Sequence, residues 1–570
     1  MTKQRTLPIV TGHREFSISV EGEVVPRSYQ LLSVSVVLEA NKIAYSRLAY
    51  KDGEASTGSF AIIDDGMFEH GKKVEIKTDE ARNSTLLFAG IIVAQQITLR
   101  ENKSSQLIIT CKHASVKMSV VSQGRYFEEV SDQDVIEELF AEHGVDVNMQ
   151  TNEAIVHKQL VQYESTDWEF CLARAQAAGL IMLTKGDTVF IVPPSVDSDA
   201  AVNLEFGATL LSADIKTDAR SQTKNVEAVR WDSAQQNIAQ RSGQIQMTES
   251  PGATNAKILS EAIGGQEHVL RAPTQSDEEL QYLADATTTM NAVNRVSGSL
   301  KTIGVSSVFP GDVVSLSGLS KNFNGKALVT GVRHEFDAVS GWRTYYQVGG
   351  ISAPNRPSVK PACGLHIGKV VDIVDPENEY RVKVKLPMLD DTSDGIWARV
   401  ASIDAGPDRG LFVRPEIDDE VIVGFVQNDM RQATVLGMLH SSAHASTETP
   451  NEDNHIKTWV TRSGLSLRFD DDLKALSLSS PNGNVIQISE DEAGIALIDE
   501  NGNQYIMNDS GITIESANDL IISASGNIEI NAGINMELSA SAQFSAKGSA
   551  GTTIESSAIT EIKGSLVQIN

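Results

Sequence analysis

Cysteines are scarce in this sequence, and the three that occur are scattered. Cys111, Cys171 and Cys363 show neither the close pairing of a zinc site nor the repeated spacing of a disulfide framework. This pattern excludes a small disulfide-stapled fold and a zinc knuckle. We expect all three residues to be buried and to act as small hydrophobic side chains.

Long apolar runs and an excess of basic residues are also missing. No apolar run approaches the roughly 18 residues of a membrane-spanning helix, and the first residues, MTKQRTLPIV, lack the apolar core of a signal peptide. We therefore expect synthesis in the cytoplasm without a signal peptide. Lys and Arg number 48 against 75 Asp and Glu, for a net charge of −27. This charge argues against binding to nucleic acid or to an anionic membrane, since phosphate contacts need clustered basic residues.

Recognisable catalytic and metal-binding motifs are absent as well. The sequence contains no GxSxG, HExxH or GxGxxG pattern, and no GxxxxGK followed by Ser or Thr. A DDTSDG stretch from Asp390 imitates the start of a calcium loop, but Thr392 takes a ligand position and Ala401 stands where the bidentate Glu is required. The acidic run 470–472 is interpreted as a solvated turn. We expect no catalytic residue, no bound metal and no cofactor.

The C-terminal tail contains a repeat. From Gly511 it divides into the octads GITIESAN, DLIISASG, NIEINAGI, NMELSASA, QFSAKGSA, GTTIESSA and ITEIKGSL, followed by VQIN. The second and fourth positions are mostly apolar, and the sixth is always small. Such an octad predicts a short strand followed by a tight bend. The large apolar residues in these two positions are Ile512, Ile514, Leu520, Ile522, Ile528, Ile530, Met536, Leu538, Phe544, Ile554 and Ile562.

The octads can close in two ways, because the backbone edges of a short strand must find partners. One chain can coil alone with three octads to a turn, or three identical chains can wind around one axis. A lone coil can use different side chains on its three faces, whereas a three-chain prism makes every octad equivalent. The octads resemble one another, which favours the trimer. An ordinary sheet domain with repetitive strands is the remaining alternative.

A compact block precedes the repeat, over residues 368–442. Alternating segments separated by Asp, Pro and Gly turns predict five short strands, at 369–374, 381–386, 397–402, 420–425 and 434–439. Five short strands in so small a block indicate a barrel of the OB type. Oligonucleotide binding by such a barrel needs a basic groove with stacking aromatics. We interpret Trp397, Phe412 and Phe425 as barrel core or interface instead.

The N-terminal half is rich in strand-like alternation, with few helices. The alternation dominates residues 16–38, 73–118 and 204–231. Helix signals occur at three places. The predicted helices run from the cap Ser131, with Asp134 three residues later, to Gly144; from after Ser165 to Gly179; and from Ser276 onward.

Several segments resemble the VgrG spike proteins, bacterial relatives of phage central tail spikes. The barrel block carries DPENEYRVKVKLP, WARV, PEIDDEVIVGF and ATVLGMLHSS, and KTWVTRSGLSLRFDDD looks like the neck of that family. YESTDWEFCLARAQAAGLIM and FPGDVVSLSGLSKNFNGKALVTGVRHEF are similar to parts of its hub. These motifs cover the whole chain in the order expected for the family.

The resemblance implies a mainly β architecture. It comprises tail-tube-like β modules with an inserted α/β module, an OB-fold barrel and a C-terminal triple-stranded (trimeric) β-helix. The implied boundaries are 1–96 and 203–360 for the tail-tube-like hub modules, 97–202 for the inserted module, 361–442 for the OB fold, 443–510 for linker and neck strands, and 511–570 for the spike. Three copies would then supply six tube-like modules around a pore.

The resemblance also implies a structural function, as the central spike and hub of a contractile injection system. Its partners would be two further copies in a homotrimer, inner tube and baseplate proteins, effector cargo and a PAAR-type tip protein. The target membrane would be contacted only mechanically. Some family members bind iron through paired histidines in the rod, but no histidine follows His455. The predicted docking residues for the tip are Leu566, Val567, Ile569 and Asn570.

Other assignments stay open at this point. The machine can be an extracellular phage-tail-like particle, which the short chain favours, a type VI secretion system or a phage tail. The particle would then be released from the cell after assembly. A different class of function is a single-chain β-helix enzyme that acts on polysaccharide.

Overall fold

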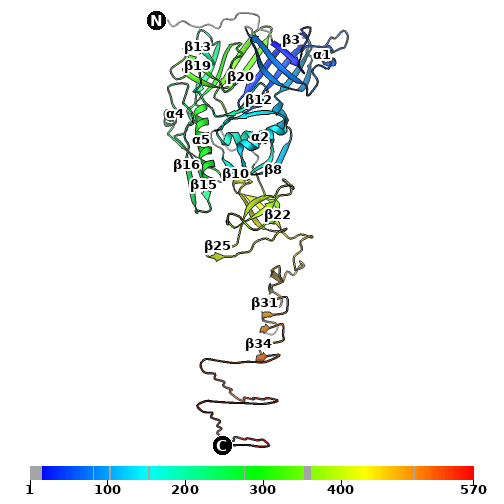
Figure 1. Cartoon of the computed structure of the whole chain (residues 1–570), viewed down its shortest axis with the longest axis vertical. Coiled ribbons are helices and arrows are strands. Elements are labelled where there is room, and N and C mark those ends of the chain that lie inside the picture. The colour runs from blue at the N-terminus through cyan, green and yellow to red at the C-terminus, as the bar shows by residue number, and fades with distance from the viewer. Residues whose placement is uncertain are drawn as a thin grey trace. The chain divides into compact units, whose positions relative to one another are not determined.

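The computed structural model describes residues 16–80, 83–101, 104–151, 155–274, 276–351, 361–491 and 494–569. The chain divides into two units, residues 1–441 and residues 442–570 (Figure 1). Strands dominate both units, so the predicted mainly β class is confirmed. Among the described residues, every helix is too short or too polar to span a lipid bilayer.

A thirteen-stranded sheet makes up much of the first unit. Its main path is β14-β18-β21-β20-β3-β4-β7-β6-β5-β1-β2, with β19 paired to β20 and β13 paired to β19. The pairing of β20 with β3 places Val332 opposite Leu38 and joins the N-terminal strands to those that follow residue 202. Alternation decides which side chains enter the core. In β7, for example, Leu107, Ile109 and Cys111 are buried.

The bounds of these strands follow. They are β1 Phe16–Val20, β2 Glu23–Val24, β3 Leu31–Glu39, β4 Tyr45–Lys51, β5 Lys73–Glu80, β6 Asn83–Thr98, β7 Gln106–Lys112, β13 Val202–Glu205, β14 Ser212–Thr217, β18 Val296–Ile303, β19 Val313–Ser317, β20 Gly325–Asp337 and β21 Gly341–Val348. The sheet contains strands of both proposed hub modules. The exact module boundaries stay predictions.

An α/β segment lies between β7 and β13. Its helix α2 begins after Ser131, whose Oγ accepts the Asp134 N–H at 3.2 Å while Asp134 accepts the Ser131 N–H at 3.1 Å. Helix α3 begins after Thr166, one residue later than predicted, because Thr166 is still the extended last residue of strand β10 and caps the helix by accepting the Glu169 N–H. The elements are the 3₁₀ turn η1 Ala114–Ser119, β8 Ser122–Ser131, α2 Asp132–Glu142, β9 Asp146–Met149, β10 Val156–Thr166, α3 Asp167–Ala177, β11 Ile181–Lys185 and β12 Thr188–Val192.

A smaller sheet carries the third predicted helix, α5. Ser276 caps it through the Glu279 N–H, and Leu280 and Ala284 face β15 and β16 in a small core. The short helices α1 and α4 were not predicted from the sequence. The elements of this region, with α1 and η2, are α1 Ala61–Asp64, η2 Ala219–Ser221, β15 Asn225–Asp232, β16 Asn237–Ser242, α4 Ala256–Ala262, β17 Glu267–Arg271 and α5 Asp277–Val293.

The block after residue 361 is a closed five-stranded barrel, as predicted. Val382, Val384 and Val423 are fully buried in its core. Phe425 packs against that core, whereas Phe412 is exposed. The elements are β22 His366–Asp372, β23 Arg381–Lys385, β24 Ile396–Val400, β25 Ala405–Gly406, β26 Arg409–Gly410, β27 Glu420–Phe425, the 3₁₀ turn η3 Val426–Asn428 and β28 Ala433–Met438.

The cysteines divide into two kinds. Cys111 and Cys171 are buried, as expected, but Cys363 is exposed, so the expectation for that residue is wrong. Cys363 lies in the irregular segment before β22, where no alternating strand directs the side chain into the barrel core.

The barrel is fixed to the hub inside the first unit by a buried ion network. Arg431, beside η3, binds Glu279 of α5 at 2.8 Å and Asp429 at 2.9 Å. Burial acts to lower the pKa of Arg431, but the two carboxylates outweigh it and hold the pKa above its ordinary value. The guanidinium therefore stays charged and bridges the two parts.

Apolar packing and a buried hydrogen bond reinforce the same joint. Val161 of β10 belongs to the core cluster of the barrel. The neighbouring Gln159 Nε2 donates to the Gly395 carbonyl at 3.0 Å. The barrel and the hub thus share one packed interface.

The second unit begins with a seven-stranded antiparallel meander in sequence order. Its strands are β29 Ile456–Val460, β30 Ser466–Asp470, β31 Ala475–Ser479, β32 Val485–Ser489, β33 Ile495–Ile498, β34 Gln504–Asn508 and β35 Gly511–Glu515. After β35 the described residues contain no further strand, but bends recur at 517–518, 525–526, 533–534, 541–542, 549–550, 557–558 and 565. The predicted eight-residue period is therefore present, with each bend just after the small sixth position.

Removal of Arg431 tests the joint. We expect Arg431→Met to lower the stability of the hub and barrel by about 3–5 kcal/mol, because the guanidinium would no longer offset the charges of the largely buried Glu279 and Asp429. The control is Lys158→Met, which removes the exposed Lys158–Glu377 pair at the same joint and should cost about 0–1 kcal/mol. Calorimetry of the full-length variants measures both, and equal losses would contradict the assigned role of Arg431.

Candidate functional site

Two rows of apolar side chains run across the meander on one face. Register fixes the rows, since residues two apart on a strand share a face. The first row is Trp459, Leu467, Leu478, Ile486, Leu497, Tyr505 and Ile514. The second is Phe469, Leu476, Ile488, Ile495, Met507 and Ile512.

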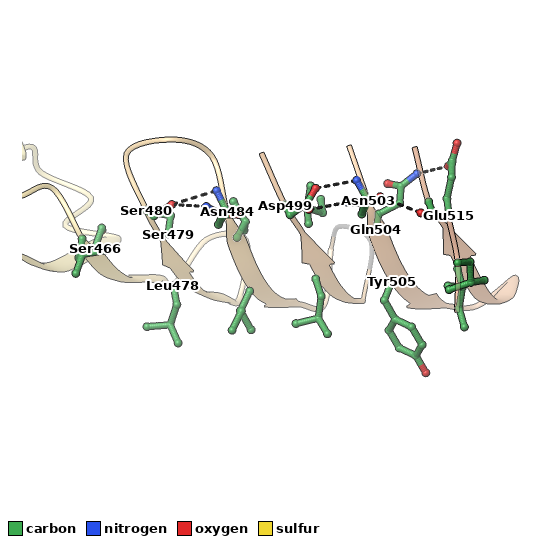
Figure 2. Close-up of a pocket in the computed structure, with 18 residues that line it drawn as sticks. Ser466, Leu478, Ser479, Ser480, Asn484, Asp499, Asn503, Gln504, Tyr505 and Glu515 are labelled. Carbon is green, nitrogen blue, oxygen red and sulfur yellow. Dashed lines mark hydrogen bonds between the residues drawn. The ribbon is translucent and has the colours of Figure 1, made fainter. Parts of the chain in front are cut away.

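These rows are only half covered in a single chain. Leu478, Ile486 and Leu497 line a groove of about 620 Å³ along the sheet, together with Tyr505 and Ile514. Figure 2 shows Leu478 and Tyr505 projecting to the same side of their strands. A continuous exposed apolar surface of this kind marks an interaction site.

The rows continue into the octads without a change of face. Ile512 ends the second row and opens the second octad position, while Ile514 ends the first row and opens the fourth position. All eleven predicted octad residues are exposed in one chain, from 51% for Met536 to 77% for Ile554. Leu520 of the second octad lines the same groove as Leu478 and Ile514, so the apolar surface of the meander extends into the start of the octads.

The backbone of the octads lacks partners too. Across residues 519–569, which are all described, no backbone–backbone hydrogen bond forms. Extended N–H and C=O groups without partners make a segment prone to pair with another chain. The octads therefore need both apolar and backbone partners from outside the single chain.

The turns at the edge of the meander are tied together by polar side chains. The Asn484 Oδ1 accepts the Glu500 N–H at 3.2 Å, and the Asn503 Oδ1 accepts the Ala517 N–H at 2.9 Å. Figure 2 shows Asn484 and Asn503 at the end of the strands, away from Leu478 and Tyr505. Hydrogen bonds from the side chain and backbone of Asn503 hold the pKa of Asp499 below its usual range. These contacts fix the spacing of successive strands.

The predicted docking residues lie at the end of the second unit. Leu566, Val567 and Ile569 are exposed, whereas Asn570 lies outside the described residues. The single chain does not gather the three into a compact cluster with a partner surface. Their proposed role stays a prediction.

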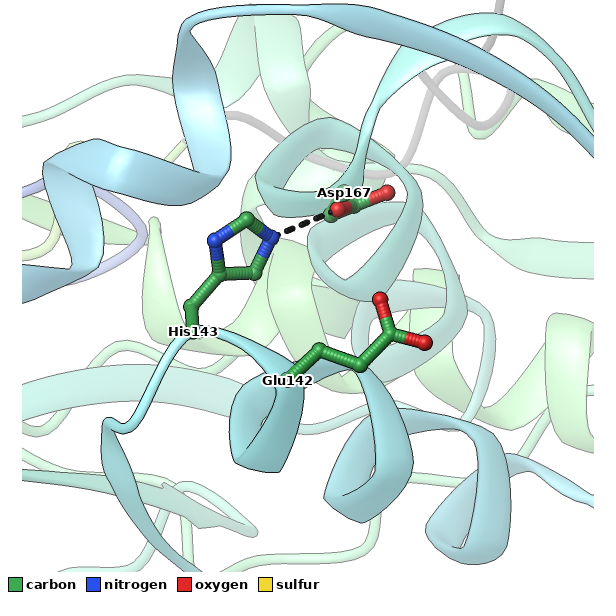
Figure 3. A group of neighbouring side chains, drawn as sticks. All are labelled: Glu142, His143 and Asp167. Carbon is green, nitrogen blue, oxygen red and sulfur yellow. Dashed lines mark hydrogen bonds and ion pairs between the residues drawn. The ribbon is translucent and has the colours of Figure 1, made fainter.

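One group of side chains has the composition of a metal site. Glu142, His143 and Asp167 lie together at the end of α2 and the start of α3 (Figure 3). The His143 Nε2 is 2.8 Å from Asp167, which also accepts a hydrogen bond from Gln162 at 2.8 Å. Both oxygens of Glu142 accept hydrogen bonds from Arg125, at 2.9 and 3.0 Å. Since a metal would have to displace Arg125, we interpret the group as an ion network that ties the two helices.

The acidic stretches set aside in the sequence form turns. The Asp390 Oδ1 accepts the Thr392 N–H at 2.8 Å. The Asp470 Oδ1 accepts the N–H groups of Asp472 and Leu473 at 3.2 Å. In both places the carboxylate accepts hydrogen bonds from backbone N–H groups two or three residues later, as in an Asx turn.

The contribution of the meander was missed from the sequence, where residues 443–510 were assigned only as linker and neck strands. A signal was present: SLRFD, ALSLS and VIQIS each carry two apolar residues two positions apart. Their strands vary in spacing, so they do not share the octad period. The antiparallel register is what brings the apolar residues of these strands into rows that lead to the first octad.

Two models of known families match this chain. A model of the Alg8 N-terminal domain family matches residues 11–338, more than half of the chain. A model described as the type VI secretion system/phage-baseplate injector OB domain matches residues 366–440, the extent of the barrel.

Two solved structures are similar in fold to this chain, with TM-scores above 0.5. A chain of the half-lidded Francisella PdpA-VgrG complex is 9% identical, with 86% of this chain and 88% of that chain covered and a TM-score of 0.55. A chain of the lidded form of the complex is 10% identical, with 89% of this chain and 81% of that chain covered and a TM-score of 0.55. The E. coli c3393 protein, described as a component of the type VI secretion system, is 12% identical, with 74% of this chain and 99% of that chain covered and a TM-score of 0.46. At these identities the likeness to the two PdpA-VgrG structures is one of fold.

The resemblance to VgrG-type spikes is thus confirmed in two ways. The barrel matches the injector OB domain, and the chain shares its fold with a PdpA-VgrG complex over most of its length. The chain belongs to the Alg8 N-terminal domain family and carries a type VI secretion system/phage-baseplate injector OB domain.

Proposed function

We propose that this chain is the central spike and hub of a contractile injection system and works as a homotrimer. Each copy joins the inner tube and baseplate, through the hub, to a membrane-piercing tip, through the rod. Contraction of a sheath drives the tube, and the spike passes the force to the tip. The observation that carries this proposal is the two-row apolar surface that runs from the meander through the octads and lacks partners in one chain.

Three copies satisfy this surface better than one. A lone coil would pair octads within the chain, yet the described octads form no backbone hydrogen bonds with one another. In a three-chain prism each layer buries about six large apolar side chains, at roughly 1.5–3 kcal/mol each. Seven octads at one strand spacing of ~4.8 Å each give a rod on the order of 35 Å, before the meander is counted. Such a rod would be narrow and stiff.

The role is mechanical rather than catalytic. Asp390 and Asp470 accept hydrogen bonds from turn backbone, and both oxygens of Glu142 accept hydrogen bonds from Arg125. The alternative from another class is a single-chain β-helix enzyme acting on polysaccharide. It would have to wind as a lone coil and function as a monomer.

The kind of machine is a further part of the proposal. We favour an extracellular phage-tail-like particle, assembled in the cytoplasm and then released, over a type VI secretion system or a phage tail. Inner tube proteins, baseplate proteins, effector cargo and a PAAR-type tip protein are the proposed partners. Neither nucleic acid nor a lipid surface is a proposed ligand, given the net charge of −27.

Ile530→Asp tests the inward face of the octads. We expect it to abolish SDS-resistant trimers, because three carboxylates would meet in an apolar interior where like charges are costly. Ser545→Asp is the control, since it adds the same charge at a third octad position, between the inward second and fourth positions. Native mass and SDS resistance are measured for both. An unchanged trimer for Ile530→Asp would show that the octad register is wrong.

Chemical activity is the second test. We expect the purified protein to hydrolyse neither peptidoglycan nor polysaccharide and to carry no stoichiometric metal. Turnover assays and elemental analysis check the two statements. Reproducible turnover that disappears in Glu142→Gln or Asp167→Asn, or one metal ion per chain, would overturn the mechanical assignment of that group.

The third test concerns the end of the rod. Deletion of residues 566–570 should leave the trimer folded, because six complete octads and everything upstream remain. It should abolish binding of a PAAR-type protein, since the apolar end formed by Val567 and Ile569 is removed. Ile569→Glu should act in the same way with less damage. Affinity is measured beside thermal stability, and full-strength binding by both folded variants would refute the docking role.

A further inference from the structure

One face of the thirteen-stranded sheet is basic, although the chain as a whole is strongly acidic. This basic face comprises the outward side chains of the consecutive strands from β14 to β7, among which β20 and β3 lie side by side (Figure 1). Strand register places four acids on it, Glu39, Asp214, Glu335 and Asp337, against seven basic residues, Arg47, Lys51, Lys112, Lys216, Lys301, Arg333 and Arg343. In the full sequence the acids outnumber Lys and Arg by 75 to 48. A local reversal of charge favours an anionic partner.

Most of the cations on the basic face have no acidic partner of their own. Arg333 pairs with Glu335 at 3.3 Å, and the other six basic residues form no ion pair with any residue that the structure describes. Two of the acids are already occupied. Glu39 pairs with Lys42, which lies after the end of β3, and Asp337 accepts the N–H groups of the turn that follows it. The cations are therefore the groups left to bind a ligand.

A single row across the basic face alternates cations with tyrosines. On successive strands, register aligns Lys301, Tyr345, Arg333, Val37, Tyr45 and Lys112. The Tyr345 ring attracts the cations on both neighbouring strands, since Lys301 Nζ lies 5.1 Å and Arg333 Cζ 4.3 Å from its centroid. Like charges held beside one ring repel each other. A bound anion would be attracted by both cations and would offset that repulsion.

A groove runs beside this row over the same strands. Its volume is about 620 Å³, and its lining extends from Lys216 on β14 to Tyr45 on β4, with Arg333 and Tyr345 between them. Ser, Gly and Gln residues of β18, β20 and β21 make up much of the remaining lining. The six strands from β14 to β4, at ~4.8 Å spacing, span roughly 24 Å, which about seven or eight extended residues cover. The groove thus has the length of a short extended peptide.

The acids on the basic face favour a polypeptide over a nucleic acid as the ligand. A nucleic acid carries a phosphate at every nucleotide, so it would also meet Asp214 and Glu335. The net charge of −27 opposes its approach as well. A peptide can place its carboxylates opposite the cations and neutral residues opposite the acids. Lys and Arg bind such carboxylates through charge-assisted hydrogen bonds.

We propose that the basic face binds an acidic segment of a partner polypeptide. The backbone of the segment lies in the groove, and its carboxylates reach Lys301, Arg333 and Lys112. All of these residues belong to one chain, so the inference goes beyond the proposed function and does not require the trimer. It gives the chemical class of a ligand for the hub.

Peptide binding to the full-length chain tests the inference. A fluorescent peptide of alternating Glu and Ser, about eight residues long, is titrated beside the same peptide with Gln in place of Glu. We expect the Glu peptide to bind about tenfold more tightly than the Gln peptide, with an affinity that falls as salt is raised. The double variant Lys301→Gln and Arg333→Gln should weaken binding of the Glu peptide by about fivefold.

Lys185→Gln is the matched control. Lys185 also lies over an aromatic ring, 4.8 Å from the Phe309 centroid, but on strand β11 of a different sheet, so its loss should leave binding unchanged. Thermal unfolding is measured for both variants. If a variant unfolds, the comparison of the two peptides on the unaltered chain decides the case.

Each contrary outcome overturns the inference. Equal binding of the Glu and Gln peptides, or no measurable binding of either, would show that the basic face does not recognise acidic peptides. Equal loss in the folded double variant and in Lys185→Gln would place binding elsewhere on the chain. A single-stranded oligonucleotide that binds more tightly than the Glu peptide, through the same two cations, would replace the peptide site with a nucleic-acid site.

Discussion

The structure depends on one constraint, the need of the C-terminal octads for partners that their own chain does not supply. Over residues 519–569 the backbone forms no hydrogen bonds with itself, and two apolar positions in each early octad point into water. Extended backbone without partners and a continuous apolar surface are both unfavourable in isolation. Assembly into the proposed trimer would remove both costs together, so folding of the rod would be coupled to its oligomerisation.

The meander, the barrel and the hub can be understood from the same requirement for partners. Within the second unit the antiparallel meander carries the same two apolar rows as the octads, since Ile512 and Ile514 belong to both. Inside the first unit, Arg431 and Val161 hold the barrel to the hub through a buried ion network and a shared core. A part that passes force needs joints of this kind, in which loss of one contact leaves a buried charge or a cavity. The hub sheet, which links its two halves through β3 and β20, fits the same requirement.

Much of this could be predicted from the sequence because local rules dominate there. The cap residues Ser131 and Ser276 begin α2 and α5 where expected, and the barrel strands follow from alternation and turn residues. The octad period is visible in the bends. What could not be predicted depends on tertiary register: the alignment of the meander rows with the octads, the exposure of Cys363 outside any strand, and the placement of Arg431 against Glu279. The octad residues could be identified by their positions in the repeat. They are exposed in a single chain, so their role as a trimer core stays a prediction.

Sedimentation equilibrium of the purified full-length chain tests the central claim, assembly through the octads, most directly. We expect a particle with three times the 61.5 kDa of one chain, unchanged on dilution, because the proposed trimer would bury the two apolar rows of the meander and the early octads. A stable, folded monomer at the same concentrations would contradict this claim. It would show that the apolar rows and the backbone of the octads need no second copy of the chain.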